Sequence, residues 1–96
     1  MSLFVVRHQH SAETCPARDA NMGQMLLKHL SPRNASQYGV TIYGDGVVDG
    51  QHTLYLIVEA NHSSQVEEFM QPFRQAGSVE VMPASTCEAV VARAGC

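Results

Sequence analysis

Alternating apolar and polar positions predict a first strand at residues 3–10. Phe4, Val6, His8 and His10 fall on one face of an extended chain, and the residues between them fall on the other. The same alternation returns at His52–Ala60. Asp49-Gly50 just before it is a strong hairpin signal, so a long second strand precedes this turn. Gly44-Asp45-Gly46 is interpreted as a bulge within that second strand.

A spacing of three and four residues between apolar positions predicts a helix before the hairpin. Thr14-Cys15-Pro16 resembles its start, with Pro16 at the first helical position, and Ser31-Pro32 ends it. Its apolar stripe consists of Met22, Met25, Leu26, His29 and Leu30.

The second half of the chain contains a further helix, a strand and a terminal helix, and its helix signals are clearer. A capping box at residues 64–67 opens a second helix, and Pro72 inside it predicts a kink or a tighter turn. Val79 and Val81 mark a short fourth strand that Pro83 is expected to end. A further capping box at residues 85–88 opens a short terminal helix.

The resulting order, β-α-β-β-α-β plus a terminal helix, predicts one ferredoxin-like α+β domain over residues 1–96, with an antiparallel sheet. Within it, we expect residues 3–10 to lie beside residues 52–60 in the sheet centre, running parallel, with the fourth strand on the other side. Helices would cover one face of the sheet. The opposite face would be left open, which favours a homodimer.

Element order and the segment HTLYLIVEA…VEEFMQPFRQAGSVEVMPAS resemble the dimeric α/β-barrel superfamily. The chain looks most like its small uncharacterised and nickel-binding members. This resemblance implies a dimeric α/β barrel that encloses a small apolar ligand. It implies no particular activity, because the superfamily includes monooxygenases, haem-degrading enzymes and metal-binding proteins.

Composition narrows the classes of function. The net charge is −3, and the six Lys and Arg residues are scattered, which argues against nucleic-acid binding. The longest apolar run, Leu54–Val58, is far shorter than the roughly 20 residues that span a bilayer. The apolar run at Leu3–Val6 breaks at Arg7, so it is read as a strand and not as a signal peptide. Three cysteines with no export signal predict a reducing cytoplasm, although Cys87 and Cys96 could pair under oxidation.

Candidate chemistry gathers at residues 7–16. His8 and His10 share one strand face, and a turn could bring the Cys15 thiolate to the same ion. Two nitrogens and one sulfur suit Zn²⁺, Cu or Ni²⁺ and leave a coordination position open. If the two central strands run parallel, Glu59 and His62 approach His10. The predicted metal ligands are therefore His8, His10, Cys15 and Glu59, in a protein that sequesters or senses a metal and does not turn over a substrate.

Other interpretations of the same residues stay open. Cys15 and His10 could form a nucleophile pair, although no Asp or Asn is evident to orient the imidazole. The histidines could be polar contacts for a small organic molecule in a cavity, or could complete an interface in a metal-free interaction module. His29 is interpreted as a structural histidine, and His52 as a solvated turn residue far from His10. Cys87 is expected to be a small buried hydrophobe, and Cys96 a mobile terminal thiol.

Overall fold

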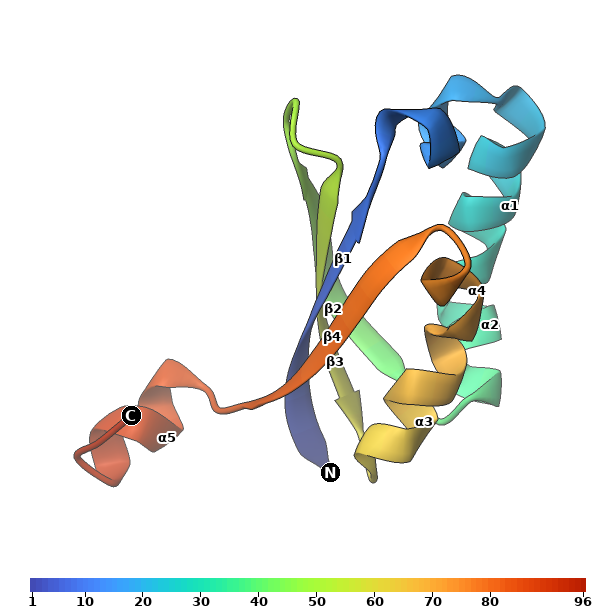
Figure 1. The fold of residues 1–96 in the computed structure, drawn as a ribbon. Coiled ribbons are helices and arrows are strands. Elements are labelled where there is room, and N and C mark those ends of the chain that lie inside the picture. The colour runs from blue at the N-terminus through green and yellow to red at the C-terminus, as the bar shows by residue number, and fades with distance from the viewer.

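The computed structural model describes residues 1–96 and has an α+β architecture, with one sheet and helices against one of its faces (Figure 1). The predicted fold class is confirmed, and the arrangement is compatible with a ferredoxin-like βαββαβ plan. The strands are β1 (Ser2–His10), β2 (Thr41–Val48), β3 (Thr53–Ala60) and β4 (Gly77–Ala84). The helices are α1 (Ala20–His29), α2 (Pro32–Gln37), α3 (Ser63–Phe69), α4 (Gln71–Arg74) and α5 (Cys87–Ala92), with short 3₁₀ turns η1 (Ala12–Thr14) and η2 (Pro16–Arg18).

The four strands lie in the order β2-β3-β1-β4, and every neighbouring pair is antiparallel. The adjacency of β1 and β3 is as expected, but the parallel direction predicted for this pair is wrong. The crossover through α1 and α2 makes β1 and β2 point the same way. The hairpin then reverses the chain, so β3 runs against β1. As a result, Gln9 near the end of β1 pairs with Thr53 at the start of β3.

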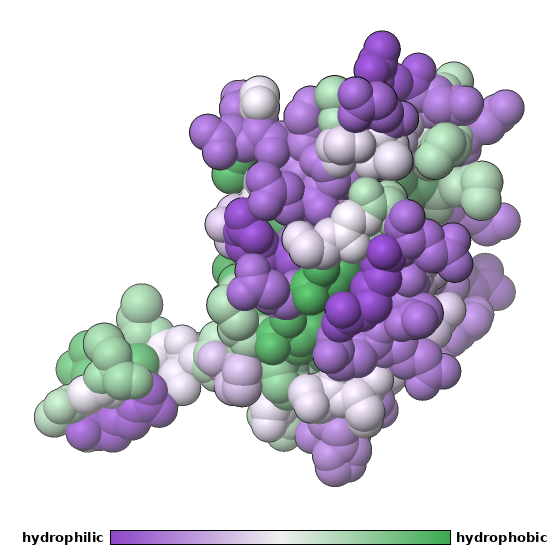
Figure 2. All heavy atoms as spheres, viewed as in Figure 1, coloured by the Kyte–Doolittle hydropathy of each residue, from purple (hydrophilic) through white to green (hydrophobic).

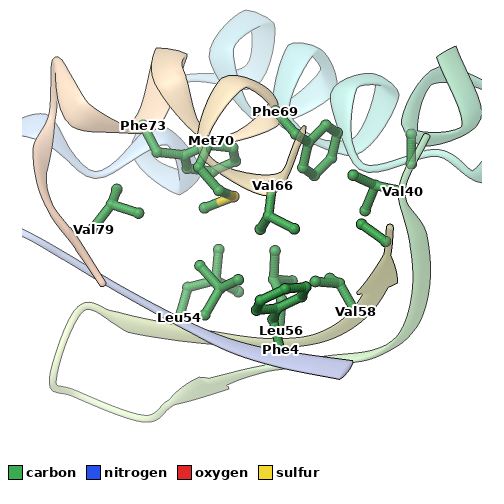
Figure 3. Packing of buried hydrophobic residues seen from close by; sticks show 13 residues of the cluster. Phe4, Val40, Leu54, Leu56, Val58, Val66, Phe69, Met70, Phe73 and Val79 are labelled. Atoms are coloured by element: carbon green, nitrogen blue, oxygen red, sulfur yellow. The ribbon is translucent and has the colours of Figure 1, made fainter. Parts of the chain in front are cut away.

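The hydrophobic core lies between the sheet and the helices. Figure 3 shows side chains of α3 and α4 pointing toward those of the sheet, with Val66, Phe69 and Met70 above Leu56 and Phe4. The inward face of β1 is buried from Phe4 through His8. The alternation predicted for β1 is therefore confirmed, and a histidine occupies the last fully buried position of its apolar face.

The first helix starts later than predicted. Two 3₁₀ turns occupy residues 12–18, and α1 begins at Ala20, where the Asp19 carboxylate caps it by accepting from the backbone N–H groups of Asn21 and Met22. Ser31-Pro32 ends α1 as expected, and it also starts α2, which the apolar pattern does not predict. The Ser31 hydroxyl caps α2 by accepting from the Asn34 N–H.

The predictions for Pro72 and Pro83 have different outcomes. Pro72 breaks the second helix into α3 and α4, as predicted. Pro83 does not end β4, which continues to Ala84, so that prediction is wrong. β4 is an edge strand, where a residue without an N–H need not break the hydrogen-bond ladder.

The predicted hairpin is confirmed, but its turn spans four residues, 49–52. Gly50 has a φ of 75°, and His52, which has a side chain, has a φ of 50°. A histidine in this left-handed region is uncommon and costs backbone energy. The expected long strand β2 is also present, but its irregularity lies between Ile42 and Gly44. The bulge predicted at residues 44–46 is therefore wrong, since these residues pair regularly with β3.

The sheet face opposite the helices remains open. Tyr43, Tyr55 and Ile57 on that face are exposed, and neighbouring Val5 and Met82 are only partly covered. Helix α5 projects from the body with no buried residue, and Figure 2 shows apolar residues on its surface. None of the helices has the length and apolar character to cross a membrane.

Candidate metal centre

The end of β1 and the hairpin turn bring His10 and His52 together. The backbone N–H of His10 donates to the His52 carbonyl at 3.1 Å, and the two ring centroids are 5.3 Å apart. His8 lies on the other side of His10, with 5.2 Å between ring centroids. The His10 ring therefore has an imidazole neighbour on its own strand and another on the hairpin turn. Figure 1 shows the hairpin tip, the end of β1 and the η1–η2 turns at this same end.

Cys15 approaches the histidines from the link between the two 3₁₀ turns. One ligand atom each from His10, Cys15 and His52 lie within 4.8 Å of one another. The loop is fixed to the sheet by the Thr14 hydroxyl, which donates to the Ala76 carbonyl just before β4 at 3.1 Å. The three side chains are all half-buried, so an ion among them would be only partly shielded from solvent.

The His10 imidazole has no hydrogen-bond partner. Both of its ring nitrogens are buried from solvent, and neither has a donor or acceptor within reach. Buried polar atoms are rarely left unpaired, because each loses its bonds to water without replacement. Burial, with the neighbouring His8 and His52 rings, lowers the pKa of His10. The neutral ring therefore keeps an unused lone pair that a metal ion could accept.

His8 has a different environment. Its Nδ1 donates to the Ser78 carbonyl at 2.9 Å, and its ring packs edge-on against Phe73, with 5.2 Å between centroids. Burial lowers the pKa of His8, while the bond to Ser78 acts in the opposite direction. The group of three potential ligands does not include His8, although its ring lies against that of His10.

Glu59 is not near the other predicted ligands. It pairs with Leu3 at the far end of β1, and its carboxylate accepts a hydrogen bond from the Tyr43 hydroxyl at 3.0 Å. His62 lies between the end of β3 and the start of α3, so it is at the same end of the sheet as Glu59. The placement of His52 as a solvated turn residue far from His10 is wrong. The correct antiparallel direction of β1 and β3 is the signal that would have identified it.

A cavity of about 260 Å³ lies against the three potential ligands. Its remaining walls are mainly apolar and include Leu26, Leu54 and Phe73. A neighbouring cavity of about 280 Å³ shares Leu26 and Phe73 and extends toward Met22 and Met25 of α1. An ion bound by the three side chains would therefore border an apolar space.

The remaining histidine and cysteine candidates do not join this site. His29 is structural, as expected, since its Nε2 donates to the Phe69 carbonyl at 2.8 Å and its ring stacks on Phe69. The expectation that Cys87 is buried is wrong, because α5 projects from the body and leaves it exposed. Cys15, Cys87 and Cys96 are all free thiols.

The donor set favours metal binding over covalent catalysis. Imidazole and thiolate together suit Zn²⁺, Cu and Ni²⁺, and three protein ligands leave a position for water or another molecule. A Cys–His nucleophile pair needs a third group that orients the imidazole. The unpartnered nitrogens of His10 provide no such contact.

Comparison with known proteins identifies a family but no activity. A family described as a domain of unknown function (DUF3303) matches residues 3–95, nearly the whole chain. No curated protein matches the chain significantly.

Proposed function

Because the chain belongs to the DUF3303 family of unknown function, we propose from its own residues that it is a small transition-metal-binding protein that sequesters or senses the ion. The ligands are His10, Cys15 and His52. This set keeps two of the residues that the sequence predicts and replaces His8 and Glu59 with His52.

The unpartnered His10 imidazole is the observation that supports this proposal most strongly. A buried ring with two unused nitrogens is costly unless a ligand supplies a partner. One ligand atom of Cys15 and one of His52 lie within 4.8 Å of a ring nitrogen of His10, so a small movement of the side chains would bring all three to one ion. His8 supports the site from outside, because its bond to Ser78 and its packing on Phe73 fix the ring beside His10.

The ion is Zn²⁺, Cu or Ni²⁺ on the chemistry of the ligands. Hard cations such as Mg²⁺ and Ca²⁺ prefer oxygen donors, and none of the three side chains supplies one. Three ligands also leave a coordination position open for water or another molecule.

The biological unit of this proposal is a cytoplasmic homodimer. Tyr43, Tyr55 and Ile57 on the open sheet face are exposed, and a second copy would cover them. The proposed compartment is a reducing one, in which the Cys15 thiol would stay available as a ligand.

Elemental analysis and calorimetric titration of the purified chain test this function. Zn²⁺, Ni²⁺ and Cu are each added to the wild type and to the variants His10→Ala, Cys15→Ser and His52→Gly. We expect near-stoichiometric binding in the wild type and a loss in all three variants.

Two further variants serve as matched controls. Cys87→Ser removes an exposed thiol, and Glu59→Gln removes a carboxylate at the far end of the sheet. Both should bind metal like the wild type. The proposal fails if the wild type takes up none of these ions, or if the ligand variants bind as well as the controls.

A further inference from the structure

We propose that the metal site is completed by a small carboxylate with an apolar body, whose anionic group ligates the ion and whose body occupies the adjoining cavity. This inference rests on the proposed function, because the metal at His10, Cys15 and His52 provides the anchoring charge.

The position of the ligands favours a bound organic molecule over water alone. His10, Cys15 and His52 all line the cavity of about 260 Å³, so the open coordination position of their ion borders that space. The remaining walls include Leu54 and Phe73, which offer no hydrogen-bonding groups from their side chains. The cavity is open to solvent, and its apolar walls favour contact with an apolar body over contact with water.

A second apolar cavity lies next to the first. Both cavities have His8, Pro16, Leu26 and Phe73 among their wall residues, so they lie next to each other. The second cavity continues toward Met22 and Met25, whose flexible thioethers adapt to irregular shapes. The apolar surface near the metal therefore continues past Leu26 toward α1.

The balance of charge selects a monoanion. A divalent ion bound by one thiolate and two neutral imidazoles carries one net positive charge. Neither cavity is lined by Lys or Arg, and the only acidic wall residue is Asp49 on the exposed hairpin turn. An anion thus has no attraction to the metal-free cavity, and more than one negative charge would be unfavourable beside Asp49.

Among simple monoanions, a carboxylate fits neutral pH best. Carboxylic acids ionise with a pKa of about 4, whereas an ordinary thiol ionises at about 8.5 and stays mostly protonated at neutral pH. The carboxylate therefore reaches the ion already charged, and displaces a bound water without a proton transfer.

The experiment uses the full chain loaded with Co²⁺, whose visible absorption reports changes in coordination. Hexanoate and acetate are titrated separately into the loaded and the metal-free protein. We expect hexanoate to shift the Co²⁺ spectrum and to bind at least about tenfold more tightly than acetate, because it buries additional methylene groups. The metal-free chain should bind neither.

A pair of variants on neighbouring residues tests where the apolar body lies. Leu26→Phe fills part of both cavities, and Leu27→Phe makes the same change at an exposed position on α1. Leu26→Phe should bring the affinity for hexanoate close to that for acetate while leaving Co²⁺ affinity unchanged. Leu27→Phe should behave like the wild type. Circular dichroism and the thermal midpoint of both variants establish that they fold.

The outcomes separate this inference from the proposed function. If Co²⁺, Zn²⁺, Ni²⁺ and Cu all fail to bind, the proposed function fails and the carboxylate site fails with it. If Co²⁺ binds but hexanoate and acetate bind alike, or leave the spectrum unchanged, only the carboxylate site is overturned. Equal binding of hexanoate to metal-free protein would also overturn it, because the metal would not be the anchor.

Discussion

The backbone N–H of His10 donates to the carbonyl of His52 at 3.1 Å, a hydrogen bond that joins the end of β1 to the hairpin turn. The same contact sets the two imidazole rings side by side, with 5.3 Å between centroids. The candidate site therefore depends on how β1 meets β3, and not only on the His-x-His spacing within β1.

Replacing His52 with glycine should separate stability from metal binding. His52 has a φ of 50°, which glycine adopts without the steric cost that a side chain brings. We expect His52→Gly to leave the free energy of unfolding unchanged or to raise it by up to about 1 kcal/mol. Metal affinity should fall by at least about tenfold, since loss of a ligand costs no less than loss of an outer-shell partner. Chemical denaturation and metal titration of the same variant measure both effects. A variant that is destabilised and still binds metal would contradict this assignment.

Metal addition should stabilise the folded chain. An ion that binds only the native state at a concentration about 100 times its dissociation constant adds about 2.7 kcal/mol to the free energy of unfolding. The thermal midpoint measured with and without Zn²⁺ should therefore rise for the wild type and for Cys87→Ser. Cys15→Ser should lose most of this rise, and a rise equal to that of the wild type would exclude Cys15 as a ligand.

The metal-free protein should lose stability as the pH falls below about 6.5, the ordinary pKa of histidine. Burial lowers the pKa of both His8 and His10, so these two imidazoles take up protons at a lower pH in the folded chain than in the unfolded chain. The contribution of these two shifts to the free energy of unfolding is fully present above the pKa of histidine in the unfolded chain. It is lost as the pH decreases toward the lowered pKa values of His8 and His10 in the folded chain. Urea denaturation from about pH 7.5 to pH 5 measures the slope, which His8→Asn should reduce. A flat profile would show that neither ring is buried in solution.

Gly77 should tolerate no side chain. A Cβ at this position would lie 1.9 Å from the Gln9 carbonyl oxygen, because β4 begins in close contact with the end of β1. Since the obstacle is backbone, Gly77→Ala should destabilise the domain by about 1–3 kcal/mol, as overpacked sites do. Gly46→Ala, where a Cβ meets nothing within 4 Å, is the matched control. Equal denaturation midpoints for the two variants would contradict the close approach of the strands.

The open sheet face should carry the proposed dimer contact. Ile57 is 46% exposed on this face, so Ile57→Asp introduces a charge without disturbing the core of a single copy. Light scattering coupled to size exclusion should show a dimer for the wild type and a monomer for this variant. Val91→Asp on α5 tests whether the projecting helix also contributes. Identical masses for the wild type and Ile57→Asp would exclude this face as the contact.

Local patterns predict local structure well in this chain. The alternation of β1 and the break at Pro72 both depend on neighbouring residues, and the structure contains both. The predicted helix starts are displaced by one or two residues, because Thr86 caps α5 in place of Ser85 and His62 precedes α3 in place of Ser64. Pro83 lies outside such rules. Its effect depends on whether β4 is an edge or a central strand, which is a property of the whole sheet.

The candidate site could be predicted only in part for a similar reason. His10 and Cys15 are close in sequence, and the spacing alone suggests their meeting. His52 joins them only because β3 runs against β1, and Glu59 leaves the site for the same reason. The lack of a hydrogen-bond partner for His10 depends on the packing around its ring, so it cannot be predicted from the spacing of residues in the sequence.

The three residues of the candidate site differ in how strongly the surrounding structure fixes their positions. His10 is fixed by the sheet and His52 by the turn bond, whereas Cys15 lies between two 3₁₀ turns that contain no buried residue. One side-chain hydrogen bond, from Thr14 to Ala76, connects this loop to β4. An ion at the site would therefore lose its thiolate first, while both imidazoles still hold it. The lifetime of the bound metal would then follow the opening of one short loop, and a competing thiol could take the ion without any unfolding of the domain.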